Sequence, residues 1–467
     1  MSKGTSMSAL TETPRISRLA LLVGIAAATV GIIYGYDSSN IGGALLYLRK
    51  DFSLDAAAEG WVTSTVVFGE IAGALFGGAL ANRIGRKPTM VLVAATFTLF
   101  SLLSGIAPTL IVLVIVRILL GVTIGISVVV VPVFVAESAP TRNRGAFLVL
   151  YQVATVAGII LGYLIAMSLA PTHSWRWMLG LAAIPGLVIT VLLLRLPDTA
   201  RWYVMMGRHA EARKALVAIE GPTVDVDKEI EVITAGFATS TTSSWRDLLR
   251  GPFLRATIFV VGLGFFVQIT GINAIVYYSP AIFESMGYTD DVTKLGLSAL
   301  VQVAGLIAVF ISLMVIDRMG RRPVLLIGIA TMIVANILLI GVFAVGGGRF
   351  DGALTTLGFI GLVLFTAGFT FGFGSLVWVY AGEAMPAHLR SLGASVMLTA
   401  DLVANVIVGL AFRPILERSG MVAFLILGIM AVAAFVFVMK LAPETKGRPL
   451  EDIAQFWENG GSWTAKK

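Results

Sequence analysis

Three ionisable residues interrupt stretches that are otherwise apolar. Asp37 lies in the first apolar run of the chain, Glu70 in the second and Arg117 in the fourth. A charge at the centre of a membrane costs about 2.5–3.5 kcal/mol on insertion scales, so such residues usually mark an ion or proton path. A conformational change that separates Asp37 from Arg117 would let the carboxylate take a proton. The alternative is a static ion pair that tethers two helices.

Glu70 has no partner that the sequence suggests. At mid-membrane its carboxyl can relay protons, or it can stay neutral and hydrogen bond to a neighbouring helix. The second interpretation is favoured from sequence, because a lone acid without a named partner is weak evidence for proton transfer.

The composition indicates that these residues belong to a membrane protein. Of the 467 residues, 57% are hydrophobic and 13% are charged, against about 25% charged residues in soluble domains. The chain has no cysteine and three histidines, which argues against a disulfide framework, a thiolate metal site or a metal enzyme. No cofactor is expected. The excess of basic over acidic residues, a net charge of +7, is better explained by membrane topology than by nucleic-acid binding.

A membrane helix needs about 20 apolar residues, and the sequence contains twelve such stretches. We expect an all-α membrane protein with an N-terminal six-helix half (1–196), a cytoplasmic helical linker (197–251), a C-terminal six-helix half (252–442) and a cytoplasmic tail (443–467). The spans are predicted at 19–45, 60–81, 88–107, 109–136, 145–169, 176–196, 253–284, 294–316, 323–345, 354–382, 391–414 and 420–441.

Lysine and arginine are concentrated in the two termini, the linker and the loops on the same side of the predicted bundle. The positive-inside rule therefore places both termini in the cytoplasm, in a multi-pass protein of the plasma (inner) membrane. Within the linker, residues 209–219, 225–237 and 243–250 are predicted to form short amphipathic helices that cover the cytoplasmic face.

A long internal repeat shows that the two halves are alike. NRIGRKP at 82–88 matches DRMGRRP at 317–323, and Pro197-Asp198-Thr199 matches Pro443-Glu444-Thr445. Two like halves in a membrane usually enclose a site that opens to each side in turn. The matched charges predict a cytoplasmic ion-pair network that forms when that side is shut and breaks when it opens. Its predicted members are Arg83, Arg86, Glu137 and Arg144 in the first half and Arg318, Arg321, Glu383 and Arg390 in the second.

Five motifs in order carry a resemblance to a known family. The two GRK/GRR loops, PVFVAESAPTRNRG (132–145), PDTARWY (197–203), QITGINAIVYYSPAIF (268–283) and PETKGR (443–448) closely resemble the sugar porters of the major facilitator superfamily. The resemblance covers nearly the whole chain. It implies the major facilitator fold and alternating-access transport of a sugar or sugar-like solute.

The resemblance also implies where the substrate binds. Sugar hydroxyls donate and accept hydrogen bonds, which suits amides, and the apolar ring face suits an aromatic side chain. The family positions hold Gln152, Gln268, Asn273, Trp378 and Asn405, and sugar/proton symporters of the family carry an Asp and an Arg where Asp37 and Arg117 stand.

The glycine between Gln268 and Asn273, Gly271, predicts a broken helix of the kind that builds mid-membrane sites. Tyr277 and Tyr278, further along the same run, are predicted to form an outer gate.

Three positions depart from the family pattern. Val267 stands where a first glutamine is common, Gly305 where an asparagine is common, and Asp401 where an asparagine or glutamine is common. The predicted pocket has therefore lost two amides and gained a carboxylate, which admits a different sugar, a polyol or a substrate with a positive group.

The leading hypothesis is proton-coupled uptake of a monosaccharide or related polyol, by a monomer surrounded by lipid. A facilitative uniporter, with Asp37 structural, is the alternative within the same fold. Proton-coupled transport of a non-sugar organic solute, including export by antiport, is disfavoured by the QITGIN run and the PETKGR tail. A sensor is disfavoured by the short tail, and no motif supports an enzyme.

Overall fold

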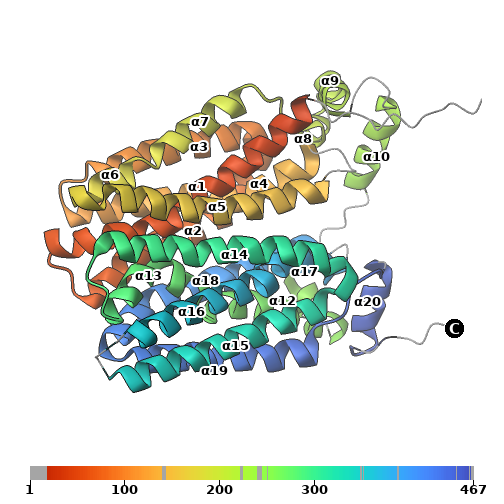
Figure 1. Cartoon of the computed structure of the whole chain (residues 1–467). Helices are drawn as coiled ribbons and strands as arrows, with labels where there is room; N and C mark the ends of the chain where they lie inside the picture. Colours follow the sequence, from red (N-terminus) through yellow and green to blue (C-terminus); the bar gives the residue numbers. More distant parts are fainter. Residues whose placement is uncertain are drawn as a thin grey trace, which may run out of the picture.

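The computed structural model of the chain describes residues 18–138, 144–220, 225–238, 245–249, 251–347, 350, 352–386, 389–448, 450–461 and 463. Within these residues the regular elements are helices, and 11 helical segments are long and apolar enough to cross a membrane. A further 34-residue helix, α1 (Arg18–Asp51), packs along the first of the two halves. The prediction of an all-α membrane protein with two six-helix halves is confirmed; Figure 1 shows the first half above the second.

The first half contains six spans, which agree with the predicted ranges to within a few residues. They are α1, α2 (Ala56–Ile84), α3 (Arg86–Gly105), α4 (Leu110–Ser138), α5 (Arg144–Leu169) followed by the short η1 (Ala170–Thr172), and a sixth span made of α6 (Trp175–Gly180) and α7 (Ala183–Leu194). The close pairs are α1 with α5 and α2 with α4.

The second half repeats this plan, with two of its spans interrupted. Its elements are α12 (Gly251–Ile269) with α13 (Ile272–Ser285), α14 (Asp291–Met319), α15 (Arg321–Gly346), α16 (Gly352–Phe369) with η2 (Thr370–Gly374) and α17 (Ser375–Glu383), α18 (Arg390–Arg418) and α19 (Gly420–Leu441). The break between α12 and α13 falls at Gly271, which has φ +103°, a value that strains residues with a Cβ. The predicted broken helix is therefore present.

Short helices lie at one end of the bundle, which we call the insert face. They are α8 (Ala200–Met205), α9 (His209–Glu220), α10 (Val226–Ala238) and α11 (Trp245–Leu248) in the linker, and α20 (Leu450–Glu458) in the tail; α8, α9, α10 and α20 are seen at the right of Figure 1. Helices were predicted at α9, α10 and α11, whereas α8 and α20 were not.

The sequence prediction gave 443–467 as a cytoplasmic tail and named no helix in it, but α20 is fixed to the second half. The Trp457 indole N–H donates to the Ala384 carbonyl at 2.7 Å, and its ring packs against Phe259. A helix of nine residues has little stability of its own, so docking on the second half, which the sequence does not show, decides whether it forms.

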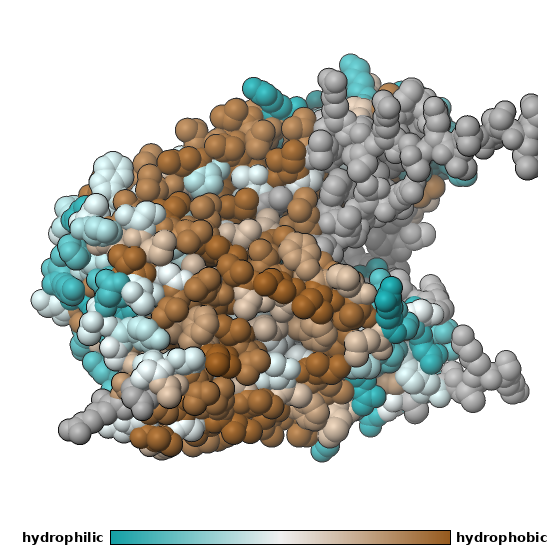
Figure 2. All heavy atoms as spheres, viewed as in Figure 1, coloured by the Kyte–Doolittle hydropathy of each residue, from teal (hydrophilic) through white to brown (hydrophobic). Residues whose placement is uncertain are grey.

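The halves meet through three helix pairs: α1 with α13, α2 with α18, and α5 with α14. Glycines allow the closest approaches, as expected where helices pack in lipid; a Cβ on Gly60 would lie 2.9 Å from the Leu410 carbonyl oxygen across the interface. Figure 2 shows hydrophobic residues over the middle of the visible face and hydrophilic residues at the end opposite the insert face, the outer face.

Candidate functional site

Asp37 and Arg117 form a buried ion pair inside the first half. Arg117 Nη1 lies 3.0 Å from Asp37 Oδ1, with side-chain exposures of 2% and 6%. The pair joins α1 to α4. Protonating the carboxylate neutralises it, which weakens the attraction and leaves the Arg117 guanidinium as the uncompensated buried charge. This arrangement can therefore respond chemically to a proton.

Glu70 lies on α2, which packs against α4 of its own half and α18 of the other, and is 3% exposed. Its Oε2 atom is buried and has no hydrogen-bond partner among the residues that the structure describes. The carboxyl interacts electrostatically with Asp37 and Arg117 in its own half and with Asp401 in the other half. Glu70 therefore belongs to the same charged region as the predicted coupling pair, which its sequence position alone did not indicate.

Gln268 and Asp401, both predicted substrate residues, are brought together in the second half. Gln268 Nε2 donates to Asp401 Oδ2 at 3.4 Å, from α12 to α18. A carboxylate only accepts hydrogen bonds, so this contact fixes the orientation of the amide. The opposite atom, Gln268 Oε1, is buried without a donor. The amide oxygen can accept from a substrate hydroxyl.

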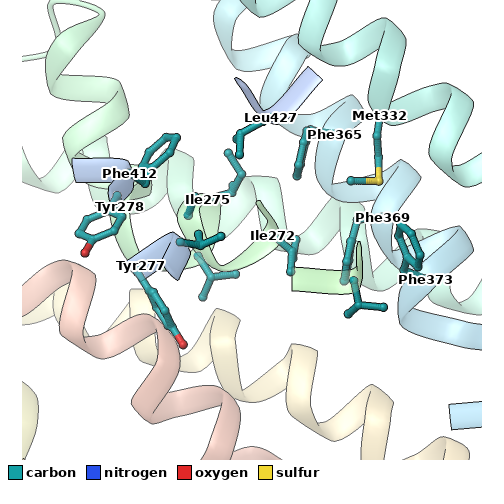
Figure 3. Close-up of a cluster of buried hydrophobic side chains, with 14 of the residues drawn as sticks. Ile272, Ile275, Tyr277, Tyr278, Met332, Phe365, Phe369, Phe373, Phe412 and Leu427 are labelled. Carbon is teal, nitrogen blue, oxygen red and sulfur yellow. The ribbon is translucent and has the colours of Figure 1, made fainter. Parts of the chain in front are cut away.

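The two predicted gate tyrosines lie just beyond the helix break, on α13. Tyr277 is held by Asn405, whose Nδ2 donates to the phenol oxygen at 3.2 Å, and Figure 3 shows the Tyr277 hydroxyl pointing toward the first half. The Tyr278 hydroxyl donates to the Gly409 carbonyl at 2.6 Å. Both tyrosines line a small cavity that also includes Arg49 and Glu59, so they lie beneath the outer face.

Among the described residues, no hydrogen bond ties the remaining predicted substrate residues to this group. Asn273 is 9% exposed at the start of α13, and Trp378 on α17 is 46% exposed. Gln152 on α5 faces the second half, because a Cβ on Gly374 would lie 3.8 Å from its Nε2 atom. Gly374 ends the π-helical segment η2, and π segments are frequent at functional sites.

Two ion pairs across the interface were missed by sequence reasoning. Arg49 Nη2 lies 2.6 Å from Glu284 Oε1, joining α1 to α13. Arg413 lies 2.8 Å from Glu59 through Nε and 3.3 Å through Nη2, joining α18 to α2. Both pairs lie at the outer face. The only sequence signal was a charge near the end of each span, and nothing in the repeat matched one charge to the other.

On the insert face, the repeat motifs of the first half form one network. Arg86 binds Glu137 through Nε at 3.1 Å and Nη2 at 3.3 Å, and the Thr199 hydroxyl donates to Glu137 at 2.6 Å. Asp198 Oδ1 accepts from the backbone N–H groups of Arg86 and Lys87 at 3.2 and 3.1 Å. Burial raises the pKa of the Asp198 carboxyl, although these backbone donors partly offset the effect.

The second half repeats the network with a longer acid. Arg321 Nε lies 3.7 Å from Glu383 Oε2, and the Thr445 hydroxyl donates to the same carboxylate at 2.5 Å. Glu444 accepts from the backbone N–H groups of Arg321 and Arg322 at 3.0 and 3.1 Å. The threonines of the Pro–acid–Thr tripeptides are thus members of the network, and their repetition was the signal for them.

The four other predicted gate residues are Arg83, Arg144, Arg318 and Arg390. Arg83 and Arg318 are exposed, and Arg390 has Nε and Nη2 buried without a hydrogen bond. The side chain of Arg144 lies outside the described residues. The pairs that do form, Arg86–Glu137 and Arg321–Glu383, each lie within one half. Separation of the halves does not by itself require them to break, and their gating role stays a prediction.

Two like halves, a broken helix at their interface and buried charges at mid-depth define a membrane transporter. The family model described as "Sugar (and other) transporter" matches residues 23–457. The chain belongs to this family, the sugar porters of the major facilitator superfamily, whose members are transporters and not enzymes.

Individual relatives agree with this assignment. The chain is 31% identical to the galactose-proton symporter of Escherichia coli, covering 91% of this chain and 92% of the relative. It is 33% identical to the glucose transporter GlcP of Staphylococcus epidermidis, covering 92% and 96%. The partially occluded inward open structure of the xylose transporter XylE from E. coli superposes with a TM-score of 0.80 at 25% identity, covering 93% of this chain and all of that one.

Proposed function

We propose that this protein takes up a monosaccharide or related polyol together with protons, by alternating access between its two halves. The observation that carries the proton part is the buried Asp37–Arg117 pair, 3.0 Å apart. The sugar part is supported by similarity to the galactose-proton symporter and to the glucose and xylose transporters. We also propose that the insert face is cytoplasmic, because its loops carry most of the lysine and arginine.

The described contacts support a state that is closed at the outer face. The ion pairs Arg49–Glu284 and Glu59–Arg413 both join the two halves there. On the insert face, the described ion pairs of the repeat motifs lie within single halves. This distribution is that of an inward-facing conformation, in which the substrate region communicates with the cytoplasmic side.

The proposed cycle begins with the outer face open. Asp37 takes a proton and loosens from Arg117, and substrate binds between Gln152 on one half and Gln268, Asn273 and Trp378 on the other. Asp401 and Asn405 hold Gln268 and Tyr277 in place through the hydrogen bonds described above. The outer ion pairs then form, and proton and substrate leave toward the insert face. We propose that one chain, divided as 1–196, 197–251, 252–442 and 443–467, carries out the whole cycle as a monomer in the plasma (inner) membrane.

Purified protein in proteoliposomes tests the mechanism. Sugar uptake driven by an imposed pH gradient should be strong in the wild type and lost in Asp37→Asn, while exchange of labelled for unlabelled sugar without a gradient should persist in the variant. Glu417→Gln, which removes an exposed carboxylate on α18, is the matched control. Uptake that ignores both the gradient and Asp37→Asn would establish a uniporter.

A thermal-shift panel of hexoses, pentoses, polyols and cationic organic solutes identifies the substrate class. Stabilisation by a sugar or polyol is expected, because a ligand that binds the folded state raises its melting temperature. Stabilisation by cationic solutes alone would reject the sugar assignment and leave the transporter fold intact.

A further inference from the structure

Glu70 is a buried acid that the proposed cycle leaves unused. It is 3% exposed, and its Oε2 atom has no hydrogen-bond partner. An ionised carboxylate that is buried without a partner loses the solvation that water would give it. Taking up a proton removes this cost and gives the group an O–H donor.

The groups that face Glu70 come from several helices. Asp37 on α1, Arg117 on α4 and Asp401 on α18 interact with its carboxyl electrostatically. Arg117 is the one cation that acts on Glu70 among the described residues, and its guanidinium is already paired with Asp37 at 3.0 Å.

The other titratable side chains that act on Glu70 among the described residues are tyrosines. Glu70 interacts with Tyr34 on α1, Tyr151 on α5 and Tyr277 on α13. A phenol can donate to the ionised carboxylate or accept from the protonated one, but it supplies no positive charge. With all acids ionised, two negative charges in this region therefore have no cation of their own.

Glu70 lies on one of the two helices, α2 and α18, that join the halves, at mid-depth along that helix pair. On α2 it lies about 16 Å deeper than Glu59, and on α18 Asp401 lies about 18 Å deeper than Arg413, at 1.5 Å per residue. Glu59 and Arg413 form the ion pair of the outer face, and α2 packs against α18. The same helix pair thus carries opposite charges at its outer end and like charges at mid-depth.

We propose that Glu70 is a second proton-binding residue of the transport cycle, and that its protonation allows α2 and α18 to close against each other beside the substrate. This inference rests on the proposed proton-coupled uptake and adds a second proton to it. With the outer face open and Asp37 still paired with Arg117, a proton from the outer solution bonds to the Glu70 carboxylate and removes its repulsion from Asp401; Asp37 takes its own proton afterwards. With the insert face open, the O–H bond breaks and the proton passes to water on that side.

Coupling stoichiometry tests the proposal. In proteoliposomes with the membrane potential clamped at zero, the logarithm of the sugar accumulation ratio rises with the pH difference, with a slope equal to the protons moved per sugar. We expect a slope of about two for the wild type and about one for Glu70→Gln. Glu417→Gln should retain the wild-type slope. A slope of about one in the wild type that Glu70→Gln leaves unchanged would overturn the proposal while the symport function stands.

Asp401→Asn provides a second route if Glu70→Gln does not fold. Removing the like charge makes ionisation of Glu70 easier, so the pH profile of uptake, normalised to the maximum of each protein, should move toward lower pH. An unmoved profile contradicts the proposal.

If Glu70→Gln keeps the wild-type slope but loses affinity tenfold or more for glucosamine relative to glucose, the carboxylate instead binds a cationic substituent of the substrate, and the proton assignment is wrong. No gradient-driven uptake at all would reject the proposed function itself.

Discussion

Glu59 on α2 and Arg413 on α18 form a two-point ion pair across the interface between the halves, with side chains 5% and 10% exposed. Breaking a buried pair by removing one partner costs about 3–5 kcal/mol, because the other charge is left unpaired. This pair therefore stabilises the state that is closed at the outer face, and it does so at a single helix–helix contact.

Arg413→Gln should shift the protein toward the outward-open state. Even if solvation of Glu59 recovers part of the cost, a loss of about 3 kcal/mol changes the conformational equilibrium about a hundredfold. The chain has no cysteine, so a single cysteine at Leu45, which lines the cavity beside Tyr277, gives a clean reporter. Labelling of Leu45→Cys by a membrane-impermeant thiol reagent from outside should increase strongly in the Arg413→Gln background.

The charge-swapped protein Glu59→Arg/Arg413→Glu is the control for that experiment. It restores opposite charges in exchanged positions and should return labelling toward the wild-type rate. Equal labelling in all three backgrounds would mean that the ion pair does not hold the outer face closed.

Gln268→Leu should weaken substrate binding without unfolding the protein. The variant loses the amide oxygen left free for a hydroxyl and the donor that orients Asp401 at 3.4 Å. Loss of about one to two hydrogen bonds lowers affinity roughly tenfold or more. The ligand-dependent thermal shift measures this, and Gln455→Leu, at an exposed site on α20, is the matched control. Unchanged affinity in Gln268→Leu would remove this residue from the substrate site.

Gly320→Ala should destabilise the second half at its insert-face turn. Gly320 has φ +100°, and a Cβ there would lie 2.5 Å from Glu444 Oε2. A backbone strained in this way costs about 1–3 kcal/mol, which lowers the thermal unfolding temperature in detergent. Gly341→Ala on α15, whose Cβ would meet nothing within 4 Å, should be neutral or slightly stabilising. Similar unfolding temperatures for the two variants would contradict the assigned role of the turn.

Asp198→Asn should change how stability depends on pH. Burial raises the pKa of Asp198 above its ordinary value of 3.8, so the folded state binds this proton more tightly than the unfolded chain. The wild type therefore loses stability as pH rises through that range, and the variant lacks this loss. The unfolding temperature of Asp198→Asn relative to wild type should increase from acidic to neutral pH. A relative decrease would show that hydrogen bonding to the ionised form dominates instead.

The fold was largely predictable from sequence because lipid imposes simple rules. Apolar runs of sufficient length set the spans, and the break at Gly271 followed from a glycine inside a polar-flanked run. The helices α8 and α20 were missed, because short helices are stabilised by docking rather than by their own sequence. Trp457 shows this, since its partners Ala384 and Phe259 lie far away in the chain.

The sequence proposed the residues of the candidate site, which stay a prediction, but it did not indicate which of them pair with each other. The resemblance placed Gln268 and Asp401 in one region, yet only the structure shows that one donates to the other. Glu70 had no sequence partner, because its neighbours Asp37 and Asp401 lie on other helices. The pair Glu59–Arg413 joins residues 354 positions apart, and no periodicity or repeat connects them.

The turns at Gly85 and Gly320 have a consequence for how the protein is made. Asp198 lies 112 residues after Arg86, and Glu444 lies 123 residues after Arg321. Each acid satisfies backbone N–H groups that stay unmatched until the ribosome has produced the last span of that half. Completion of each half is therefore a distinct event during synthesis, because a chain that ends before Asp198 or Glu444 leaves the N–H groups of that turn without their acceptor.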